Sequence, residues 1–161
     1  MADKSAPVVS NTTPLINLIG VGLLDLLPKL YGTVAIVDVV RDEYAAGKAA
    51  AEPDLESLPW LQIVSSVPTH PSLPSQLGKG EAATISLAVA LNARAVLLDE
   101  AYGRRLAHTL GLPIVGTLAV LLAAKQNGLV SAVAPIIDEM IRQGRRISAP
   151  LRQQILTAAG E

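Results

Sequence analysis

The chain has no cysteine and no phenylalanine, and its only aromatic side chains are Trp60 and three tyrosines. The absence of cysteine excludes disulfide bonds and thiolate metal sites, and it is typical of an intracellular protein. Since 50% of the 161 residues are hydrophobic, the core must be built from Leu, Ile, Val and Ala. A chain of this length can bury such a core, and we expect a single domain over residues 1–161.

Strong charge of either sign is also missing, because the formal net charge is −1. Such a chain has no general field that attracts nucleic acid or an anionic membrane, so any nucleic-acid contact has to come from a local patch. The apolar run at 109–124 is interrupted by Pro113 and Gly116, and it is shorter than the roughly 20 residues that span a bilayer. The first residues, MADKSAP, lack the apolar centre of a signal peptide. We therefore expect a soluble, cytoplasmic protein that binds no membrane.

Short apolar segments alternate with helical ones along the whole chain. The pattern predicts strands at 8–10, 33–37, 62–64, 95–98 and 113–115, and helices at 14–27, 38–46, 80–92, 100–110, 117–127, 132–143 and 149–158. This alternation is typical of a parallel sheet with helices on both faces. In such sheets ligands bind outside the carboxyl ends of the strands. Attention therefore falls on the residues that follow strands, namely Asn11, Asp99, Glu100 and Thr117.

Several acidic residues stand where solubility alone does not explain them. Asp99 and Glu100 close a buried strand, Glu81 shares the apolar face of its helix with Ile85, and Glu43 lies one helical turn beyond a pair of valines. Carboxylates that point to a common rim repel one another unless a cation neutralises them. Oxygen ligands with no His or Cys nearby favour Mg²⁺ or Mn²⁺ over zinc.

Each of these acids also has a structural explanation. Glu81 lies in a first helical turn, where the helix dipole favours an acid by about 0.3–1 kcal/mol. Asp99 could cap the following helix, and Glu43 beside Asp42 could belong to a solvated face. Phosphate-binding glycine motifs are missing, which argues against a Rossmann-like enzyme for small molecules. The combination of acids near one sheet edge is harder to explain by these separate structural roles, so a metal site stays open beside them.

Five segments, in this order, carry a resemblance to a known family: VVSNTTPLINL, VVRDEYAAG, GKGEAATISLAVAL, AVLLDEAYGRRLAHTLGL and IVGTLAVLLAAKQNGLV. With them the sequence resembles PIN-domain proteins, and more narrowly the prokaryotic PIN-like branch described as nucleic-acid-binding. The resemblance implies an α/β three-layer sandwich, with a parallel sheet of about five strands in the order 3-2-1-4-5 flanked by helices. The helices from about 131 to 160 would belong to this single domain.

The resemblance also implies a function, since many PIN domains are Mg²⁺-dependent ribonucleases and a large group are toxins of toxin–antitoxin pairs. It implies a catalytic set at Asn11, Glu43, Glu81 and Asp99. The metal ligands would be Asp99, Glu81 and Glu43, with Glu100 as a fourth and Mg²⁺ or Mn²⁺ as the ion. The implied partners are RNA or single-stranded DNA, an antitoxin protein and a second copy of the chain.

Basic residues near such an acidic site would guide the nucleic-acid strand. Arg104 and Arg105 fall with His108 on one helical face that begins at Glu100, and with Thr117 they form the predicted nucleic-acid-binding set. A second basic cluster, formed by Arg142, Arg145, Arg146 and Arg152, is interpreted as a solvated helix face.

Asn11 departs from the family pattern, because an acid usually ends the first strand. Its amide oxygen can still coordinate a cation, but it brings no charge, so metal affinity should be lower. Two functions therefore stay open. One is a metal-dependent ribonuclease, and the other is a PIN-like module with a weak or inactive site that binds nucleic acid or a protein.

Overall fold

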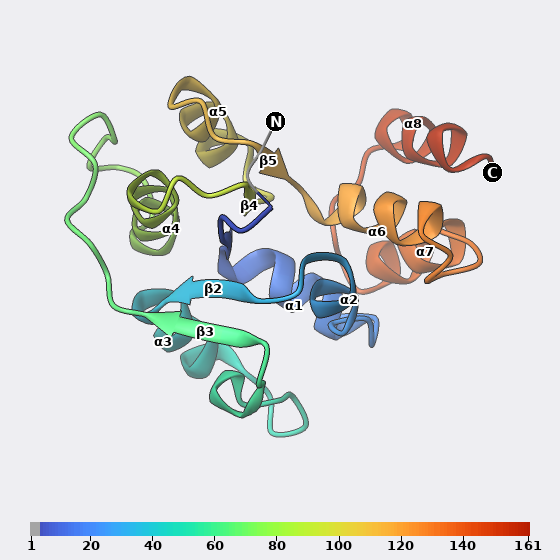
Figure 1. Ribbon diagram of the computed structural model, residues 1–161. Coiled ribbons are helices and arrows are strands. Elements are labelled where there is room, and N and C mark those ends of the chain that lie inside the picture. The colour runs from blue at the N-terminus through green and yellow to red at the C-terminus, as the bar shows by residue number, and fades with distance from the viewer. Residues whose placement is uncertain (1–3) are drawn as a thin grey trace.

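The computed structural model describes residues 4–161 and contains one sheet of five parallel strands. The strands are β1 (Val8–Ser10), β2 (Val34–Val37), β3 (Leu61–Val64), β4 (Ala95–Leu97) and β5 (Ile114–Val115). Their order is β3-β2-β1-β4-β5, with β1 pairing to β2 on one side and to β4 on the other (Figure 1). Both the parallel sheet and its strand order confirm the expected fold class.

Helices connect the strands and continue beyond the last one. They are α1 (Thr12–Gly20), α2 (Leu26–Tyr31), α3 (Asp38–Gly47), α4 (Lys79–Ala90), α5 (Ala101–Thr109), α6 (Thr117–Gln126), α7 (Ala134–Arg142) and α8 (Ala149–Ala159), with a short 3₁₀ helix η1 (Leu55–Ser57). In Figure 1 the last three gather at one side of the molecule, and α6 contacts α8. Within residues 4–161, no helix is both long enough and apolar enough to cross a bilayer.

The expected single helix over 14–27 is wrong, because the chain folds into α1 and α2 with a turn between them. Gly22 adopts a φ of +71°, the left-handed conformation that glycine reaches without a steric penalty. The amide of Gly22 donates to the carbonyl of Ile19, and the amide of Leu23 donates to that of Leu18. This pair of bonds is a Schellman motif, which ends a helix.

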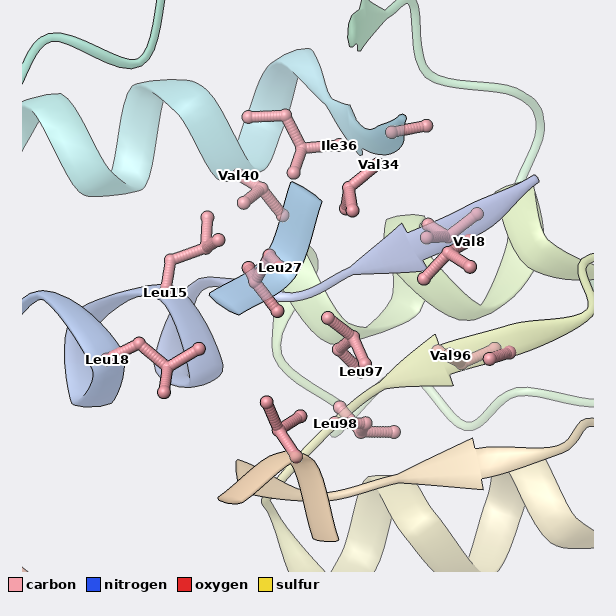
Figure 2. Close-up of a cluster of buried hydrophobic side chains, with 14 of the residues drawn as sticks. Val8, Leu15, Leu18, Leu27, Val34, Ile36, Val40, Val96, Leu97 and Leu98 are labelled. Atoms are coloured by element: carbon pink, nitrogen blue, oxygen red, sulfur yellow. The ribbon is translucent and has the colours of Figure 1, made fainter. Parts of the chain in front are cut away.

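The core is aliphatic, as the lack of Phe requires. Figure 2 shows valine, leucine and isoleucine side chains of β1, β2 and β4 packing with those of α1, α2 and α3. Val8, Val34 and Val96 are fully buried, and Val8 is in register with Val34 on the neighbouring strand. Burying a side chain of this size contributes about 1.5–3 kcal/mol. The packed sheet therefore holds the carboxyl ends of its strands in fixed positions.

Candidate active site

The candidate site lies where the strand order reverses, between the carboxyl ends of β1 and β4. The amide of Asn11, directly after β1, donates to the carbonyl of Leu97 at 2.9 Å. The amide of Leu98, directly after β4, donates to the carbonyl of Val115 at the end of β5, at 3.0 Å. Three strand ends are thus tied together at the point where open α/β sheets bind their ligands.

Asp99 is held at this edge by donors from two helices. Its Oδ1 accepts the backbone amide of Thr117 at 2.7 Å, and its Oδ2 accepts the Thr117 hydroxyl at 2.5 Å. Asn17 Nδ2 donates to the same Oδ2 at 3.0 Å. Thr117 is the first residue of α6, so the carboxylate lies at a helix N-terminus, where backbone amides favour an anion. The structure thus brings the predicted residues Asp99 and Thr117 into direct contact.

Asn17 belongs to this site, although sequence reasoning missed it. It lies in α1 between the buried Leu15 and Leu18, and only 9% of its surface is exposed. Its Oδ1 is buried and has no hydrogen-bond partner among the described residues. The available signal was a polar amide within the apolar run PLINL, since buried polar groups usually have partners. The sequence could not name Asp99 as that partner, because it lies 82 positions away.

Glu43 joins three helices near the same edge. It lies on α3 and is exposed, and its Oε1 accepts the amide of Gly80 in the first turn of α4 at 3.1 Å. Its Oε2 accepts the hydroxyl of Thr12, the first residue of α1, at 3.1 Å. The expectation that Glu43 points partly toward the site is therefore supported by its contacts, although its side chain is not buried.

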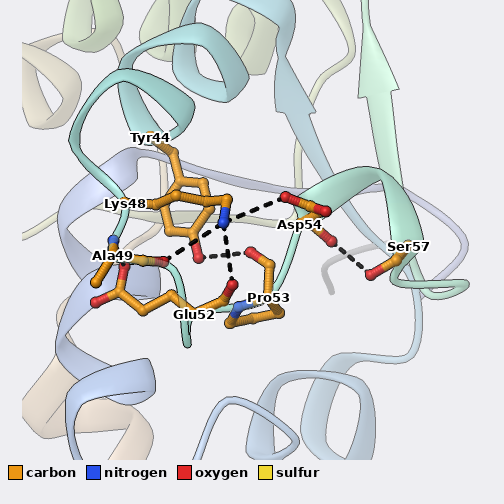
Figure 3. Close-up of polar contacts among 7 residues, drawn as sticks. All are labelled: Tyr44, Lys48, Ala49, Glu52, Pro53, Asp54 and Ser57. Carbon is orange, nitrogen blue, oxygen red and sulfur yellow. Dashed lines mark hydrogen bonds and ion pairs between the residues drawn. The ribbon is translucent and has the colours of Figure 1, made fainter.

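A polar cluster fixes the end of α3 beyond Glu43 (Figure 3). The Tyr44 hydroxyl donates to the carbonyl of Pro53 at 2.7 Å, and the Lys48 ammonium lies 3.4 Å from the carboxylate of Asp54. Ser57 closes the cluster by donating to the carbonyl of Asp54 at 2.6 Å. These contacts tie the helix to the segment after it, so that α3 holds Glu43 in place.

Glu81 is the predicted acid whose ionised form is least favourable in the structure. It lies in the first turn of α4, and burial raises the pKa of its carboxyl, with further contributions from the nearby Glu100 and Glu43. Its Oε2 is buried and accepts no hydrogen bond from the described part of the chain. A carboxylate in such surroundings is stabilised by a cation or by protonation.

Three glycines leave room for three of the predicted carboxylates. A Cβ atom added at Gly80 would meet Glu43, and one added at Gly103 would meet Glu81. At Gly116 it would meet the guanidinium of Arg104 first and then the carboxylate of Asp99. Gly103 is buried inside α5, where glycine typically costs about 0.5–1 kcal/mol relative to alanine. The steric need at Gly103 explains why a glycine is found inside this helix.

Asn11 begins α1 through its backbone but does not cap it through its side chain. It is the N-cap residue, with φ −82° and ψ 177°, and its side chain makes no capping hydrogen bond. Only 4% of its surface is exposed, and its buried Oδ1 has no partner among residues 4–161. The amide oxygen is thus a free neutral ligand at the end of β1, where the family pattern has an acid.

These oxygen atoms are chemically suited to a divalent cation but do not form a ready-made cage. Carboxylate and amide oxygens are the ligands that Mg²⁺ and Mn²⁺ prefer, and three of them, on Glu81, Asn11 and Asn17, are buried without partners among the described residues. No group of three acidic or histidine side chains in the described residues comes close enough to hold a metal ion. A cation would therefore be held by few protein ligands and by water, which is the usual arrangement for Mg²⁺.

Of the predicted nucleic-acid contacts, the two arginines make other interactions. Arg104 donates from Nη1 to the carbonyl of Leu98 at 2.8 Å, which ties α5 to the end of β4. The guanidinium of Arg105 lies 5.6 Å from the ring centre of Tyr102, on an exposed face. These contacts leave the predicted role of Arg104 and Arg105 untested.

A pocket of about 480 Å³ opens beside Asp99. Asn17, Asp99 and Glu100 line it together with Arg145 and Arg146. Because α7 ends at Arg142, these two arginines lie in the connection between α7 and α8. The interpretation of these two arginines as part of a helix face is therefore wrong, although Arg146 is exposed to solvent.

The chain is similar to known proteins in both its sequence and its fold. A family model described as a PIN domain matches residues 7–161. No curated protein matches the sequence. A similar solved structure is that of a PilT N-terminus domain protein from the hyperthermophilic archaeon Sulfolobus solfataricus P2, with a TM-score of 0.56 and 13% sequence identity. The similarity covers 73% of this chain and 92% of the archaeal one, and at this identity it concerns the fold alone.

Proposed function

Because the chain belongs to the PIN domain family, whose members are generally nucleases that use divalent metal ions, we propose that it is a Mg²⁺- or Mn²⁺-dependent ribonuclease. Its site would be the carboxyl edge between β1 and β4. The observation that carries this proposal is the state of Glu81, whose buried Oε2 lacks a partner and whose pKa is raised by burial and by two neighbouring acids. A divalent cation would relieve this repulsion.

Each acid has a separate task in this proposal. Glu81 and Asp99 supply the charged ligands, Asn11 adds a neutral oxygen, and Glu43 and Glu100 complete the negative rim. Thr117 and Asn17 orient the Asp99 carboxylate through their hydrogen bonds. A bound cation would lower the pKa of a water molecule and neutralise charge that develops on the scissile phosphate.

A second candidate is a PIN-like module that binds nucleic acid or a protein without cleaving RNA. Two observations favour it. The oxygens of Asp99 and Glu43 already accept hydrogen bonds from the protein, and Asn11 removes one charge from the edge. Both features would lower the affinity for a cation.

Calorimetric titration with Mn²⁺ tests the metal site. We expect the wild type to bind, and Asp99→Asn to lose at least about tenfold in affinity because one of two charged ligands becomes neutral. Asn11→Asp should tighten binding by a similar factor, because it adds a charge next to the cation. Glu56→Gln is a matched control, since Glu56 is an exposed acid on η1.

Cleavage of a structured RNA in Mn²⁺ then separates the two functions. Hydrolysis by the wild type that is lost in Asp99→Asn supports the ribonuclease. RNA binding without cleavage, even in Asn11→Asp, supports the binding module. If neither the wild type nor Asn11→Asp binds Mn²⁺, the acids are structural and the ribonuclease proposal fails.

The proposal extends to partners. As a toxin of a toxin–antitoxin pair, the chain would be inhibited by an antitoxin protein, and it would associate as a homodimer. Sedimentation of the purified chain measures the association into a homodimer directly, and a monomer at all concentrations would refute it.

A further inference from the structure

The pocket beside Asp99 is lined by acidic and by basic side chains, which we call its acidic wall and its basic wall. The acidic wall consists of Asp99 and Glu100 at the end of β4. The basic wall consists of Arg145 and Arg146, in the connection between α7 and α8. The volume of the pocket, about 480 Å³, lies within the range of pockets that hold small ligands or parts of larger ones.

Among residues 4–161, the two arginines of the basic wall have no ion-pair partner, unlike their neighbours Arg142 and Arg152. Arg152 makes a bidentate contact with the carboxylate of Asp138, with hydrogen bonds of 2.9 and 3.0 Å. Arg142 forms an ion pair with Glu139. In the part of the chain that the structure describes, the side chains of Arg145 and Arg146 make no hydrogen bond and no ion pair. The Nε of Arg145 is also buried and has no acceptor. Such a donor is costly unless a ligand supplies the acceptor.

The basic wall is anchored by contacts at both of its ends. Gln143 Nε2 donates to the carbonyl of Gly20 at the end of α1, at 2.7 Å, and the amide of Arg145 donates to the carbonyl of Met140 at 3.0 Å. On the far side, Ser148 caps α8 by accepting the amide of Leu151 at 3.3 Å. The arginines are therefore held beside the pocket by the protein itself.

We infer that Arg145 and Arg146 bind backbone phosphates of a nucleic-acid strand that enters this pocket beside Asp99. The inference rests on the proposed function for its substrate class. A guanidinium group can bind a phosphate through two parallel hydrogen bonds, in a bidentate contact. A chain of net charge −1 with an acidic site repels nucleic acid unless a local pair of cations offsets the repulsion.

The remainder of the pocket suits the uncharged parts of a nucleotide. Leu118, Ile147 and Leu151 line it together with the two arginines. A strand places one charge on each nucleotide and uncharged ribose and base between charges, so it can contact both the arginines and this apolar surface. An acidic peptide is the other anionic ligand that two free arginines could bind, and the experiment below separates the two.

The test is equilibrium binding of a fluorescein-labelled single-stranded oligouridylate, measured by anisotropy in EDTA so that no metal-dependent cleavage occurs. The variants are Arg146→Ala, at an exposed position, and the double variant Arg145→Met/Arg146→Ala, in which methionine keeps apolar packing at the partly buried position. Arg142→Ala is the matched control, because Arg142 is exposed, already paired with Glu139 and not part of the pocket.

We expect the double variant to bind roughly tenfold more weakly, and Arg146→Ala to show an intermediate loss. The dependence of log affinity on log salt should flatten by about 1.4, because each phosphate contact on a single strand contributes about 0.7. Arg142→Ala should stay within about twofold of the wild type. Melting temperatures confirm that the variants are folded.

Three outcomes overturn the inference. One is equal oligouridylate affinity and salt dependence in the wild type and in Arg146→Ala. Another is a wild type that binds no oligouridylate. The third is a double variant that keeps oligouridylate binding and loses only a polyglutamate peptide, which would assign the basic wall to a protein ligand. Arginine-dependent binding without cleavage in Mn²⁺ would leave the inference standing and refute the ribonuclease proposal alone.

Discussion

At the scale of one residue, Glu81 shows that the fold makes an ionised carboxylate unfavourable at the candidate site. The carboxyl is partly buried, two other acids lie nearby, and Gly103 leaves room for the side chain. The sequence indicated Glu81 because an acid on an apolar helix face is unusual. Asn17 also stands out as a polar amide in an apolar helix, but the sequence could not name Asp99, in a distant segment, as its partner.

The raised pKa of Glu81 predicts a pH-dependent stability. Because the folded chain holds the proton more tightly than the unfolded chain, stability falls as pH rises from about 4.5 through the raised pKa. Above the raised pKa, the ionised Glu81 carboxylate lowers the stability of the folded chain by its full amount. Glu81→Gln should therefore melt at a higher temperature than the wild type at neutral pH without divalent ions. The gain is small, roughly 1–2 °C, because solvent screens the carboxylate.

Thermal melts of both proteins from pH 3 to pH 8 in EDTA measure this effect. The two melting temperatures should converge below pH 4.5, where Glu81 is protonated in both folded and unfolded chains. A gain that is the same at every pH would show that the amide packs better and that ionisation of Glu81 has no cost. The same variant should bind Mn²⁺ more weakly than the wild type.

The elements at the C-terminal end illustrate what a pattern can and cannot predict. Three helices after β5 were expected from their apolar spacing, and α6, α7 and α8 confirm them. The same kind of pattern predicted one helical region over 14–27, where the chain forms α1 and the start of α2, because both segments are apolar. The turn at Gly22 depends on two backbone hydrogen bonds that no hydrophobic period records. The capping of α7 is also invisible in the sequence, since its cap comes from a residue that follows α8.

Glu161 supplies that cap. Its carboxylate accepts the amides of Val133 at 2.7 Å and Ala134 at 3.1 Å, at the N-terminus of α7, and lies 3.0 Å from the Lys125 ammonium. These contacts lower the pKa of Glu161 to about 2. They join the end of α8 to the start of α7 and to α6, and so they support the basic wall between α7 and α8.

Replacing Glu161 by glutamine should lower the melting temperature at pH 7. The pKa is lower in the folded chain, so the contribution is complete above about 4.5 and disappears as pH falls toward about 2. We expect the difference between the wild type and Glu161→Gln to shrink across this window. Glu56→Gln is the control at an exposed acid. A difference that persists unchanged at pH 2 would contradict the capping role.

At the scale of the whole molecule, the sheet brings together residues that lie far apart in the sequence. Asn11, Glu43, Glu81 and Asp99 come from four different segments, and all lie near the carboxyl ends of β1, β2 and β4. The alternation of strands and helices predicted this edge, because parallel strands all end on one side. Which oxygens would be taken by internal hydrogen bonds was not predictable, since it depends on side-chain geometry across these segments.

A cation at this edge should therefore stabilise the whole domain. A ligand that binds only the folded chain adds about 2.7 kcal/mol at 100 times its dissociation constant. For a domain of this size, each kcal/mol raises the melting temperature by about 2–4 °C. Mn²⁺ at that concentration should thus raise the melting temperature of the wild type by roughly 5–10 °C, as measured by calorimetry.

Asp99→Asn distinguishes binding at the candidate site from binding elsewhere. Asparagine keeps one oxygen for the Thr117 hydroxyl and Asn17 donors, but it loses the acceptor of the Thr117 backbone amide and the charge that attracts the cation. A melt without Mn²⁺ therefore first checks that the variant is folded. The Mn²⁺-induced rise should fall to a small fraction of the wild-type value. An equal rise in both proteins would place the ion away from β1 and β4. Because unfolding separates the four segments that carry Asn11 and the three acids, only an ion bound between them links its affinity to the stability of the entire sheet.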